Sequence, residues 1–303
     1  MDATHAALSP FDLTPIRDLY PFHTARLPLP GATMSYVDEG AGPPVLLVHG
    51  NPTWSFYFRH LIAGLRPHQR VIVPDHIGCG LSDKPQDYPY RLATHIENLG
   101  RLVDHVGLQQ VDLVVHDWGG AIGMGWAVRN PERVRRIVVL NTSAFLSPRL
   151  PWRIAVCRYP IFGDLAVRGL NAFALAATVM AAARPLAPAV RQGYLLPFDS
   201  WANRVAIQRF VRDIPMSPKH PTWALVDAID RELPTLCSKP MLILWGGQDW
   251  CFSDHFLAGW MQRFPDAEVV RFDYAAHYVL EDAHAEAVPR VVRFLGKDTE
   301  TRK

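Results

Sequence analysis

Three side chains suited to catalysis follow one another along the chain in the order Asp117, Asp249 and His277. Each comes after a short apolar run of the kind that forms a buried strand, so all three are expected at the ends of strands. A carboxylate nucleophile, a carboxylate that orients an imidazole, and the imidazole as general base together form a working catalytic set. One His among 13 is usually structural, but three residues in this order at three strand ends indicate catalysis.

Asp117 occupies a turn between a predicted strand and a predicted helix. Residues 114–123 read Val-Val-His-Asp-Trp-Gly-Gly-Ala-Ile-Gly. This is the layout of a nucleophile elbow, in which G-x-S-x-G presents a side chain on a sharp strand-to-helix turn. Here Asp117 takes the Ser position and Val115 replaces the first Gly, while three small residues let the helix pack closely. An isolated Asp before a helix is more often an N-cap, but the context favours a nucleophile.

An Asp nucleophile implies chemistry that differs from that of a Ser nucleophile. A carboxyl with an ordinary pKa is ionised by a factor of roughly 10³ at pH 7. It therefore needs no base to activate it, whereas a Ser hydroxyl does. Attack on an ester carbonyl would form a reactive anhydride, but displacement at a saturated carbon gives a covalent alkyl ester. The targets that fit are carbon–halogen bonds, epoxides and strained lactones.

A second candidate feature is the turn His49-Gly-Asn-Pro52, which directly follows an apolar run. The backbone N–H groups of Asn51 and Trp118 would form an oxyanion hole beside the nucleophile. Both side chains also carry N–H groups, and together they would hold a departing halide or carboxylate. Taken singly, Asn51 fits a turn residue before Pro and Trp118 fits core filling. The pair beside Asp117 favours anion binding.

The composition of the 303-residue chain excludes several classes of protein. It is 49% apolar and 20% charged, which is ordinary for a globular protein and excludes disorder. The net charge of +2 gives no reason to expect a nucleic acid or an anionic lipid as partner. Four widely spaced cysteines fit a reducing compartment, and the first 22 residues lack the apolar core of a secretory signal, so we expect a cytoplasmic protein. The longest weakly polar run, residues 172–183, falls short of the about 20 residues of a membrane span.

Short apolar runs alternate with helical patterns through most of the chain, which indicates an α/β fold with a mostly parallel central sheet. The predicted strands lie at residues 44–48, 70–74, 111–115, 136–140, 241–245 and 267–272. The predicted helices lie at residues 92–106, 121–128, 169–183 and 201–211. No metal-binding or dinucleotide motif is present, so we expect no cofactor.

The pattern changes between residues 146 and 218, where helical pieces interrupted by Pro replace the strands. A helical insertion between parallel strands would lie over their carboxyl ends, where ligands bind. We therefore predict a core of residues 1–145 and 219–303 and a helical cap of residues 146–218, the alternative being ordinary helices on the sheet. Residues 297–303 are predicted to form a solvated tail. Apolar cap residues that would line a pocket, or equally fill a core, are Leu170, Phe173, Leu175, Val179, Met180 and Leu195.

Four motifs resemble the haloalkane-dehalogenase-like branch of the α/β-hydrolase fold. They read HGNPTWSFYFRHL, PDHIGCGLSDKP, VVHDWGGAIG and AHYVLEDA, and the likeness spans residues 30–297. The resemblance implies an α/β-hydrolase fold with a helical cap. It further implies that Asp117 is the nucleophile and that His277 is the base. Asp249 would be the acid, with Asn51 and Trp118 as the anion-binding pair.

Within that branch, residues 54–59, 197–204 and 245–252 are similar to the β-lactone decarboxylases of bacterial long-chain olefin biosynthesis. Those enzymes convert a cis-3,4-dialkyl-oxetan-2-one into an alkene and CO₂. The resemblance implies a hydrophobic small-molecule substrate and a multi-enzyme assembly with a lactone-forming synthetase. It departs at Ala276, where relatives usually carry Gly, and the additional methyl group is expected to shift the loop of His277 slightly.

Three alternatives stay open at this point. A haloalkane dehalogenase would use the same five residues and release halide and alcohol. An epoxide hydrolase would use two cap tyrosines, for which Tyr159 and Tyr194 are available, but that group favours an aromatic residue where Asn51 stands. A binding subunit with a decayed site would lack competent side chains, whereas every catalytic position here is filled by one.

Overall fold

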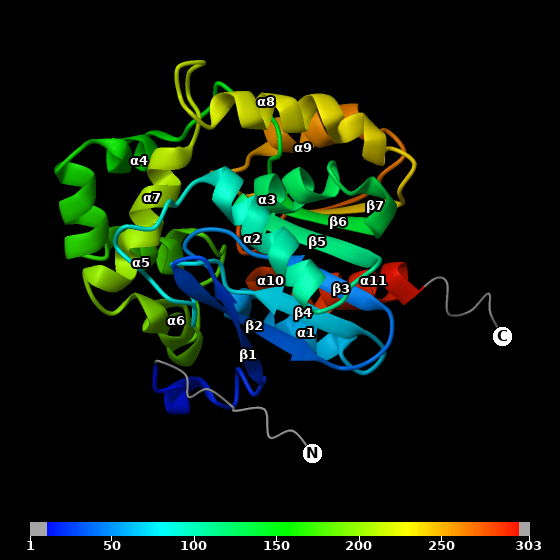
Figure 1. Ribbon diagram of the computed structural model, residues 1–303, viewed down its shortest axis with the longest axis horizontal. Helices are drawn as coiled ribbons and strands as arrows, with labels where there is room; N and C mark the ends of the chain where they lie inside the picture. Colours follow the sequence, from blue (N-terminus) through cyan, green and yellow to red (C-terminus); the bar gives the residue numbers. More distant parts are fainter. Residues whose placement is uncertain (1–10, 297–303) are drawn as a thin grey trace.

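An eight-stranded sheet forms the centre of the molecule (Figure 1), and the computed structural model describes residues 11–296. The strands are β1 (Thr24–Leu29), β2 (Ala32–Glu39), β3 (Pro44–Val48), β4 (Arg70–Pro74), β5 (Val111–Asp117), β6 (Val134–Thr142), β7 (Met241–Gly246) and β8 (Glu268–Phe272). Their order across the sheet is β1-β2-β4-β3-β5-β6-β7-β8. Strand β2 runs antiparallel to both β1 and β4, and every other neighbouring pair is parallel. The predicted α/β class with a mostly parallel sheet is confirmed.

The six strands predicted from apolar runs are all present, and their ends lie within two residues of the prediction. The β1–β2 hairpin was not predicted. Its two strands lie at the edge of the sheet and are only partly buried, so polar residues such as Arg26 and Asp38 interrupt their apolar pattern. Gly31 joins them with a φ of 79°, a conformation that favours glycine.

Alternate side chains of the central strands enter two separate cores. In β3, Leu46 and Val48 face one core, and Val45 and Leu47 face the other. Burial on both faces explains why these strands carry uninterrupted apolar runs. The helices that cover the faces are α1 (Arg59–Leu65), α2 (Leu92–His105), α3 (Trp118–Ala127), α8 (Trp223–Glu232), α9 (Asp254–Arg263), α10 (Val279–Asp282) and α11 (His284–Gly296). Residues of α2, α3, α8 and α9 belong to the first core, and those of α1, α10 and α11 to the second.

The segment predicted as a cap contains helices and turns, and no strand is found within residues 146–218, all of which the structure describes. Its helices are α4 (Trp152–Ala155), α5 (Ala172–Met180), α6 (Pro188–Leu195) and α7 (Val205–Asp213). They stand together on the left of the sheet in Figure 1. The helix predicted at residues 169–183 is observed as the shorter α5, and that at residues 201–211 as α7 preceded by a 3-10 turn.

Several predictions about the rest of the chain can be compared with the structure. Within residues 11–296, no helix combines the length and the apolar character that crossing a membrane requires. Over the same residues, no group of three or more His, Cys, Asp or Glu side chains is placed to hold a metal ion. The four cysteines are free thiols. The predicted tail at residues 297–303 and the first ten residues lie outside the described residues.

A buried ion pair between α1 and α10 also binds a side chain of α6. Arg59 in α1 donates to both carboxylate oxygens of Glu281 in α10, at 2.6 and 2.7 Å, and the two side chains are only 4% and 7% exposed. The hydroxyl of Tyr194 in α6 donates to the same carboxylate. The Tyr194 ring stacks on Tyr278 with 4.9 Å between the ring centroids. Because Tyr278 directly follows His277, this network holds the loop that carries the predicted base.

Arg59→Met should lower the free energy of unfolding by about 3–5 kcal/mol, because it leaves the buried carboxylate of Glu281 without a counter-charge. Urea unfolding followed by circular dichroism measures the change. The control is Arg66→Met, since Arg66 is 40% exposed in its ion pair with Glu39 and should contribute less than about 1 kcal/mol. Equal losses in the two variants would contradict a structural role for the buried pair.

Candidate active site

Asp117 stands on a strained turn between β5 and α3. Its φ of 52° and ψ of −127° lie in a region that residues other than glycine rarely adopt. The hydroxyl of Thr142 in β6 donates to the carbonyl of Asp117 and holds this conformation. A Cβ on Gly50 would overlap the carboxyl of Asp117, and a Cβ on Gly119 would overlap the carbonyl oxygen of Val48. Glycine is therefore required at both positions, in the loop after β3 and in the first turn of α3.

The two carboxylate oxygens of Asp117 have different surroundings. Oδ1 accepts the backbone N–H of Asn51 at 2.5 Å. The backbone N–H of Trp118 also lowers the pKa of this carboxyl. Oδ2 lies 3.6 Å from Nε2 of His277. Of the two N–H groups that were predicted to hold a substrate oxyanion, that of Asn51 therefore binds the side chain of Asp117 itself. Oδ2 is the oxygen that remains for a reacting atom.

Asp249 orients His277 through a short hydrogen bond. Nδ1 of His277 lies 2.8 Å from Oδ2 of Asp249, and since an ionised carboxylate only accepts, Nδ1 is the donor. Oδ1 of Asp249 accepts the backbone N–H groups of Cys251 and Phe252 at 2.7 and 3.0 Å. The side-chain amide of Asn141 donates to Oδ2 at 3.0 Å. These donors give Asp249 a single orientation, which leaves Nε2 of His277 facing Asp117.

Burial and charge act against each other in the pKa values of the site. Burial raises the pKa of Asp117 above its ordinary value, although the charge of His277 and the N–H groups of Asn51 and Trp118 lower it. Burial alone would lower the pKa of His277, but the charge and hydrogen bond of Asp249, with a smaller part from Asp117, raise it above its ordinary value. The imidazole therefore keeps a high affinity for a proton, which a general base requires.

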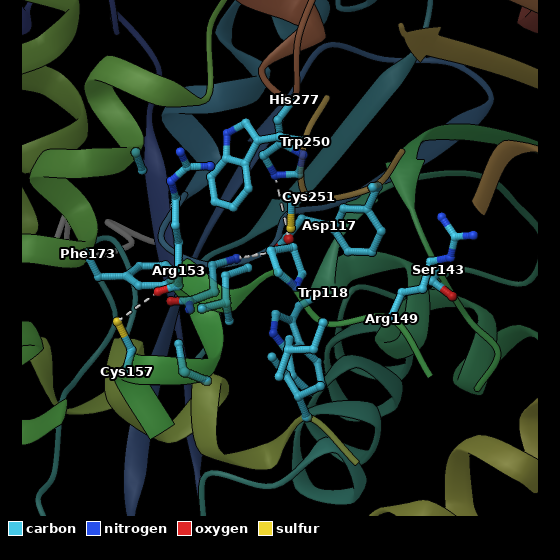
Figure 2. A pocket seen from close by; sticks show the side chains of 18 of the residues that line it. Asp117, Trp118, Ser143, Arg149, Arg153, Cys157, Phe173, Trp250, Cys251 and His277 are labelled. Carbon is cyan, nitrogen blue, oxygen red and sulfur yellow. Dashed lines mark hydrogen bonds and ion pairs between the residues drawn. The ribbon is translucent and has the colours of Figure 1, made fainter. Parts of the chain in front are cut away.

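A cavity of about 500 Å³ opens beside Asp117. Asp117, Asn51, Trp118 and His277 line it from the strand ends (Figure 2), and side chains of residues 146–218 line it from the opposite side. The part of this second wall that α5 and the residue after it supply consists of Ala172, Phe173, Ala176, Ala177, Met180 and Ala181. Because these side chains are apolar, the cavity suits an apolar ligand.

The predicted anion-binding side chains both lie on the wall of this cavity, but they differ in their partners. Nδ2 of Asn51 donates to the carbonyl of Ile207 in α7 at 3.3 Å, and Oδ1 of Asn51 is buried without a partner. The indole of Trp118 lies 5.3 Å from the ring of Phe210, and its N–H has no hydrogen-bond acceptor among the described residues. Trp118 can therefore donate to an anion directly, whereas Asn51 must first release Ile207.

The six apolar residues of the predicted cap that were expected to line a pocket, or equally to fill a core, have different surroundings. Phe173 and Met180 line the cavity. The others, Leu170, Leu175, Val179 and Leu195, are absent from its wall, and Leu170 and Val179 are 74% and 70% exposed. The helical period of α5 places residues 172, 176 and 180 on the cavity side and residues 175 and 179 away from it. Four alanines, together with Phe173 and Met180, thus shape this wall.

The two tyrosines that kept an epoxide hydrolase open do not line the cavity. Tyr159 is 65% exposed. Tyr194 is buried, and its hydroxyl donates to Glu281. Neither hydroxyl is placed to activate an epoxide oxygen in the cavity, so this alternative loses its support.

Ala276 does not disturb the histidine loop. Its N–H donates to Asp282 at 2.9 Å, and its carbonyl packs against Gly246, where a Cβ would overlap it. Nδ1 of His277 still reaches Asp249 at 2.8 Å. Ala276 is therefore compatible with the hydrogen bond that orients His277.

Three supporting residues were not singled out from the sequence: His116, Asn141 and Thr142. Nε2 of His116 is 3.0 Å from the carbonyl of His277, while Asn141 and Thr142 contact Asp249 and Asp117 as described above. Their position in the sequence could have identified them. His116 directly precedes the predicted nucleophile, and Asn141 and Thr142 end the neighbouring strand. A polar side chain at the end of a buried strand in a parallel sheet is a candidate for such a role.

Comparison with known proteins places these residues in a family. The family model described as the alpha/beta hydrolase fold matches residues 43–284 of this chain. A protein of Shewanella oneidensis named cis-3-alkyl-4-alkyloxetan-2-one decarboxylase is 46% identical over 93% of this chain and 91% of its own length. A protein of the same name from Xanthomonas campestris pv. campestris is 44% identical over 92% and 98%. The crystal structure of a haloalkane dehalogenase from Agrobacterium tumefaciens has a TM-score of 0.81 at 29% identity and covers 90% of this chain and 96% of that chain. The predicted resemblance is confirmed.

Asp249→Asn should lower the pKa of His277 below its ordinary value, because burial remains while the charge that raises the pKa is removed. An NMR titration of the imidazole resonances measures this. In the wild type the raised pKa of His277 stabilises the fold below the unfolded-state pKa, and this stabilisation is lost as the pH rises through the folded-state value. The control is Asp254→Asn, which removes an exposed carboxylate paired with Arg271. An unchanged pKa of His277 in Asp249→Asn would show that the pair is not coupled.

Proposed function

Because the chain belongs to the alpha/beta hydrolase fold family, we propose that it is a β-lactone decarboxylase that converts a cis-3,4-dialkyl-oxetan-2-one into an alkene and CO₂. Two relatives described above carry this activity in their names. The observation that carries the proposal is Oδ2 of Asp117, a carboxylate oxygen that faces His277 while the N–H of Asn51 binds Oδ1, at an apolar cavity. A carboxylate suits displacement at a saturated carbon, and apolar walls suit alkyl chains.

The side chains of the site take distinct roles in this proposal. Asp117 is the nucleophile, and the backbone N–H of Asn51 holds the oxygen that does not attack. The side chains of Asn51 and Trp118 bind the anion that the reaction releases. Asp249 holds His277 in one orientation and stabilises its charged form. No cofactor takes part.

The reaction proceeds in two steps that balance without water. Oδ2 of Asp117 forms a bond to the ring carbon that bears the lactone oxygen, with inversion, and the bond between that carbon and the ring oxygen breaks to free a carboxylate. The electron pair of the bond to the carboxylate carbon then forms the carbon–carbon double bond and expels Asp117 as CO₂ leaves. Inversion followed by anti elimination is net syn, so a cis ring gives a cis alkene.

Attack at the lactone carbonyl is the alternative first step. It would create an oxyanion that needs hydrogen-bond donors. The backbone N–H of Asn51, one of the two candidate donors, already binds Asp117 and is not available for it. Attack at the ring carbon needs no such donors, and the arrangement therefore favours it.

The proposal includes a cap formed by residues 146–218 over a core of residues 1–145 and 219–303. Its support is the position of the cavity, which residues of both parts line. The small side chains of α5 leave space opposite Asp117 that larger residues would fill. Two alkyl chains attached to one small ring need such space on both sides of the reacting carbon.

A cytoplasmic location and an assembly with a lactone-forming synthetase belong to the same proposal. Four free thiols suit a reducing compartment. A lactone with two long alkyl chains has little solubility in water, so its direct transfer from the enzyme that makes it would be an advantage.

Haloalkane dehalogenation is the second candidate activity. The likeness to the dehalogenase structure favours it, and so does the arrangement of Asp117, His277, Asp249 and Trp118. In that reaction Asp117 displaces halide, and His277 takes a proton from the water that hydrolyses the alkyl ester. The two candidates share the first step and differ in the fate of the ester.

A synthetic cis-dialkyl β-lactone should be converted to alkene and CO₂, as measured by gas chromatography. Asp117→Asn should slow alkene release by at least about 10³-fold, because an amide cannot attack carbon in this way. The control is Asp104→Asn, which removes an exposed carboxylate at the C-terminal end of α2. This variant should keep the wild-type rate. Halide release from 1-bromobutane without alkene from the lactone would instead support the second candidate.

Turnover of the lactone in ¹⁸O-labelled water should leave Asp117 unlabelled, because the elimination regenerates the carboxylate without water. Mass spectrometry of the peptide that contains Asp117 measures the label. A hydrolytic ester intermediate would introduce ¹⁸O into the carboxylate at each turnover. Labelled Asp117 after steady alkene production would therefore contradict the water-free route, and a haloalkane that is turned over provides the positive control.

A further inference from the structure

Large apolar side chains are exposed mainly on one part of the molecule. Of the ten that are exposed among the described residues, eight lie within residues 146–218. They include Trp152, Tyr159 and Ile161, which are 68%, 65% and 75% exposed. Single exposed apolar residues are normal, but a contiguous group of them marks an interaction surface.

Five of these side chains surround two hollows. Trp152 and Phe162 line the cavity beside Asp117 and are also exposed, so they stand at its rim. Ile161, Leu165 and Trp201 line a second, shallow hollow. Ile161 and Phe162 are consecutive, so one turn contributes to both hollows. We call the five side chains Trp152, Ile161, Phe162, Leu165 and Trp201 the rim patch.

The backbone at Ile161 is strained. Its φ is 64°, which a β-branched residue rarely adopts. Its side chain is 75% exposed, so little packing offsets the strain. Strain that the fold does not need is more common at functional positions. The turn therefore presents an apolar side chain to its surroundings.

The rim patch lies in a strongly basic part of the chain. Residues 146–218 contain nine Arg and no Lys against three Asp, a net charge of +6, and because the whole chain carries +2, the remainder carries −4. The overall charge, which gave no reason to expect an anionic partner, conceals this asymmetry. Arginines line both hollows: Arg149, Arg153, Arg168, Arg209 and Arg212. Arg149, Arg153 and Arg209 form no ion pair with any described carboxylate, and Figure 2 shows the first two on opposite sides of the cavity, away from Asp117.

We propose that the rim patch binds the surface of a membrane that contains anionic lipids, with the cavity opening toward the bilayer. Exposed aromatic and aliphatic side chains would enter the boundary between headgroups and acyl chains, while the guanidinium groups bind lipid phosphates. An apolar ligand would then pass from the bilayer into the cavity without crossing water. This inference goes beyond the proposed function, since membrane binding requires no particular substrate.

An acidic protein or a second copy of the chain would also match part of the charge pattern. The position of the cavity favours the membrane. A rigid partner that covered the rim patch would close the route along Trp152 and Phe162 to Asp117. A bilayer is fluid and would supply ligand through the same surface that it covers.

Sedimentation with vesicles tests the proposal in the absence of substrate. The protein should pellet with vesicles of phosphatidylcholine and phosphatidylglycerol and stay in the supernatant with phosphatidylcholine alone, and added salt should weaken the binding. Ile161→Asn/Leu165→Gln should weaken binding at least about tenfold, because it removes two apolar contacts. Arg209→Gln should weaken it about fivefold, the effect of one cation near an anionic surface.

Matched variants outside the rim patch serve as controls. Met261→Gln in α9 and Arg101→Gln in α2 remove an exposed apolar side chain and an exposed cation elsewhere, and both should bind as the wild type does. Activity of Ile161→Asn/Leu165→Gln on a short-chain, water-soluble lactone should be unchanged, so a defect in binding can be separated from a defect in catalysis or folding. Failure to pellet with either kind of vesicle would overturn the proposal, as would equal losses in the controls. Self-association that the rim-patch variant abolishes would overturn it in favour of a protein interface.

Discussion

A carboxylate that is only 6% exposed, as Asp117 is, has lost most of its hydration, and burial accordingly raises its pKa. Desolvation alone would drive such a group to its neutral form. The surroundings of Asp117 oppose this through the N–H groups of Asn51 and Trp118 and through the charge of His277. The imidazole of His277 is in turn hydrogen-bonded to Asp249. The N–H of Asn51 binds Oδ1, whereas Oδ2 faces His277, and Oδ2 is the oxygen that we propose reacts.

This arrangement depends on a parallel sheet. Strands β3, β5, β6, β7 and β8 run side by side in one direction, so their carboxyl ends meet at the same edge. Asn51 follows β3, Asp117 ends β5, and Asp249 and His277 follow β7 and β8. Strand β6 lies between β5, which ends at Asp117, and β7, which precedes Asp249. Of its last two residues, Asn141 donates to Asp249 and Thr142 donates to the carbonyl of Asp117. The sheet therefore sets the distances between these residues, and the ends of its strands and the loops after them carry the side chains of the candidate site.

The sequence was sufficient to predict whatever depends on strand order and on burial of both faces of the sheet. Uninterrupted apolar runs marked six strands, and the side chains after them marked Asp117, Asp249 and His277, which the structure brings together. It was not sufficient where contacts between distant segments decide the outcome. The half-buried β1–β2 pair carries no clear apolar pattern, and Asn141 acquires a partner only when β6 and β7 align. The cavity wall that alanines of α5 help to form could not be predicted either. The apolar sequence of this helix is compatible with a face buried in a core and equally with a face that lines a cavity.

In the proposed mechanism, one ester of Asp117 is common to the reactions of decarboxylases and dehalogenases. Displacement at carbon by Oδ2 gives the same alkyl ester whether halide or a lactone carboxylate leaves. An ester without a neighbouring carboxylate has no route onward except hydrolysis, for which His277 must act on water at the 3.6 Å gap to Asp117. An ester that retains the carboxylate on the adjacent carbon has a second route, loss of CO₂ with expulsion of Asp117. Under this proposal the substrate selects the reaction, and an apolar cavity filled by two alkyl chains would favour elimination, because little room would remain for water beside His277.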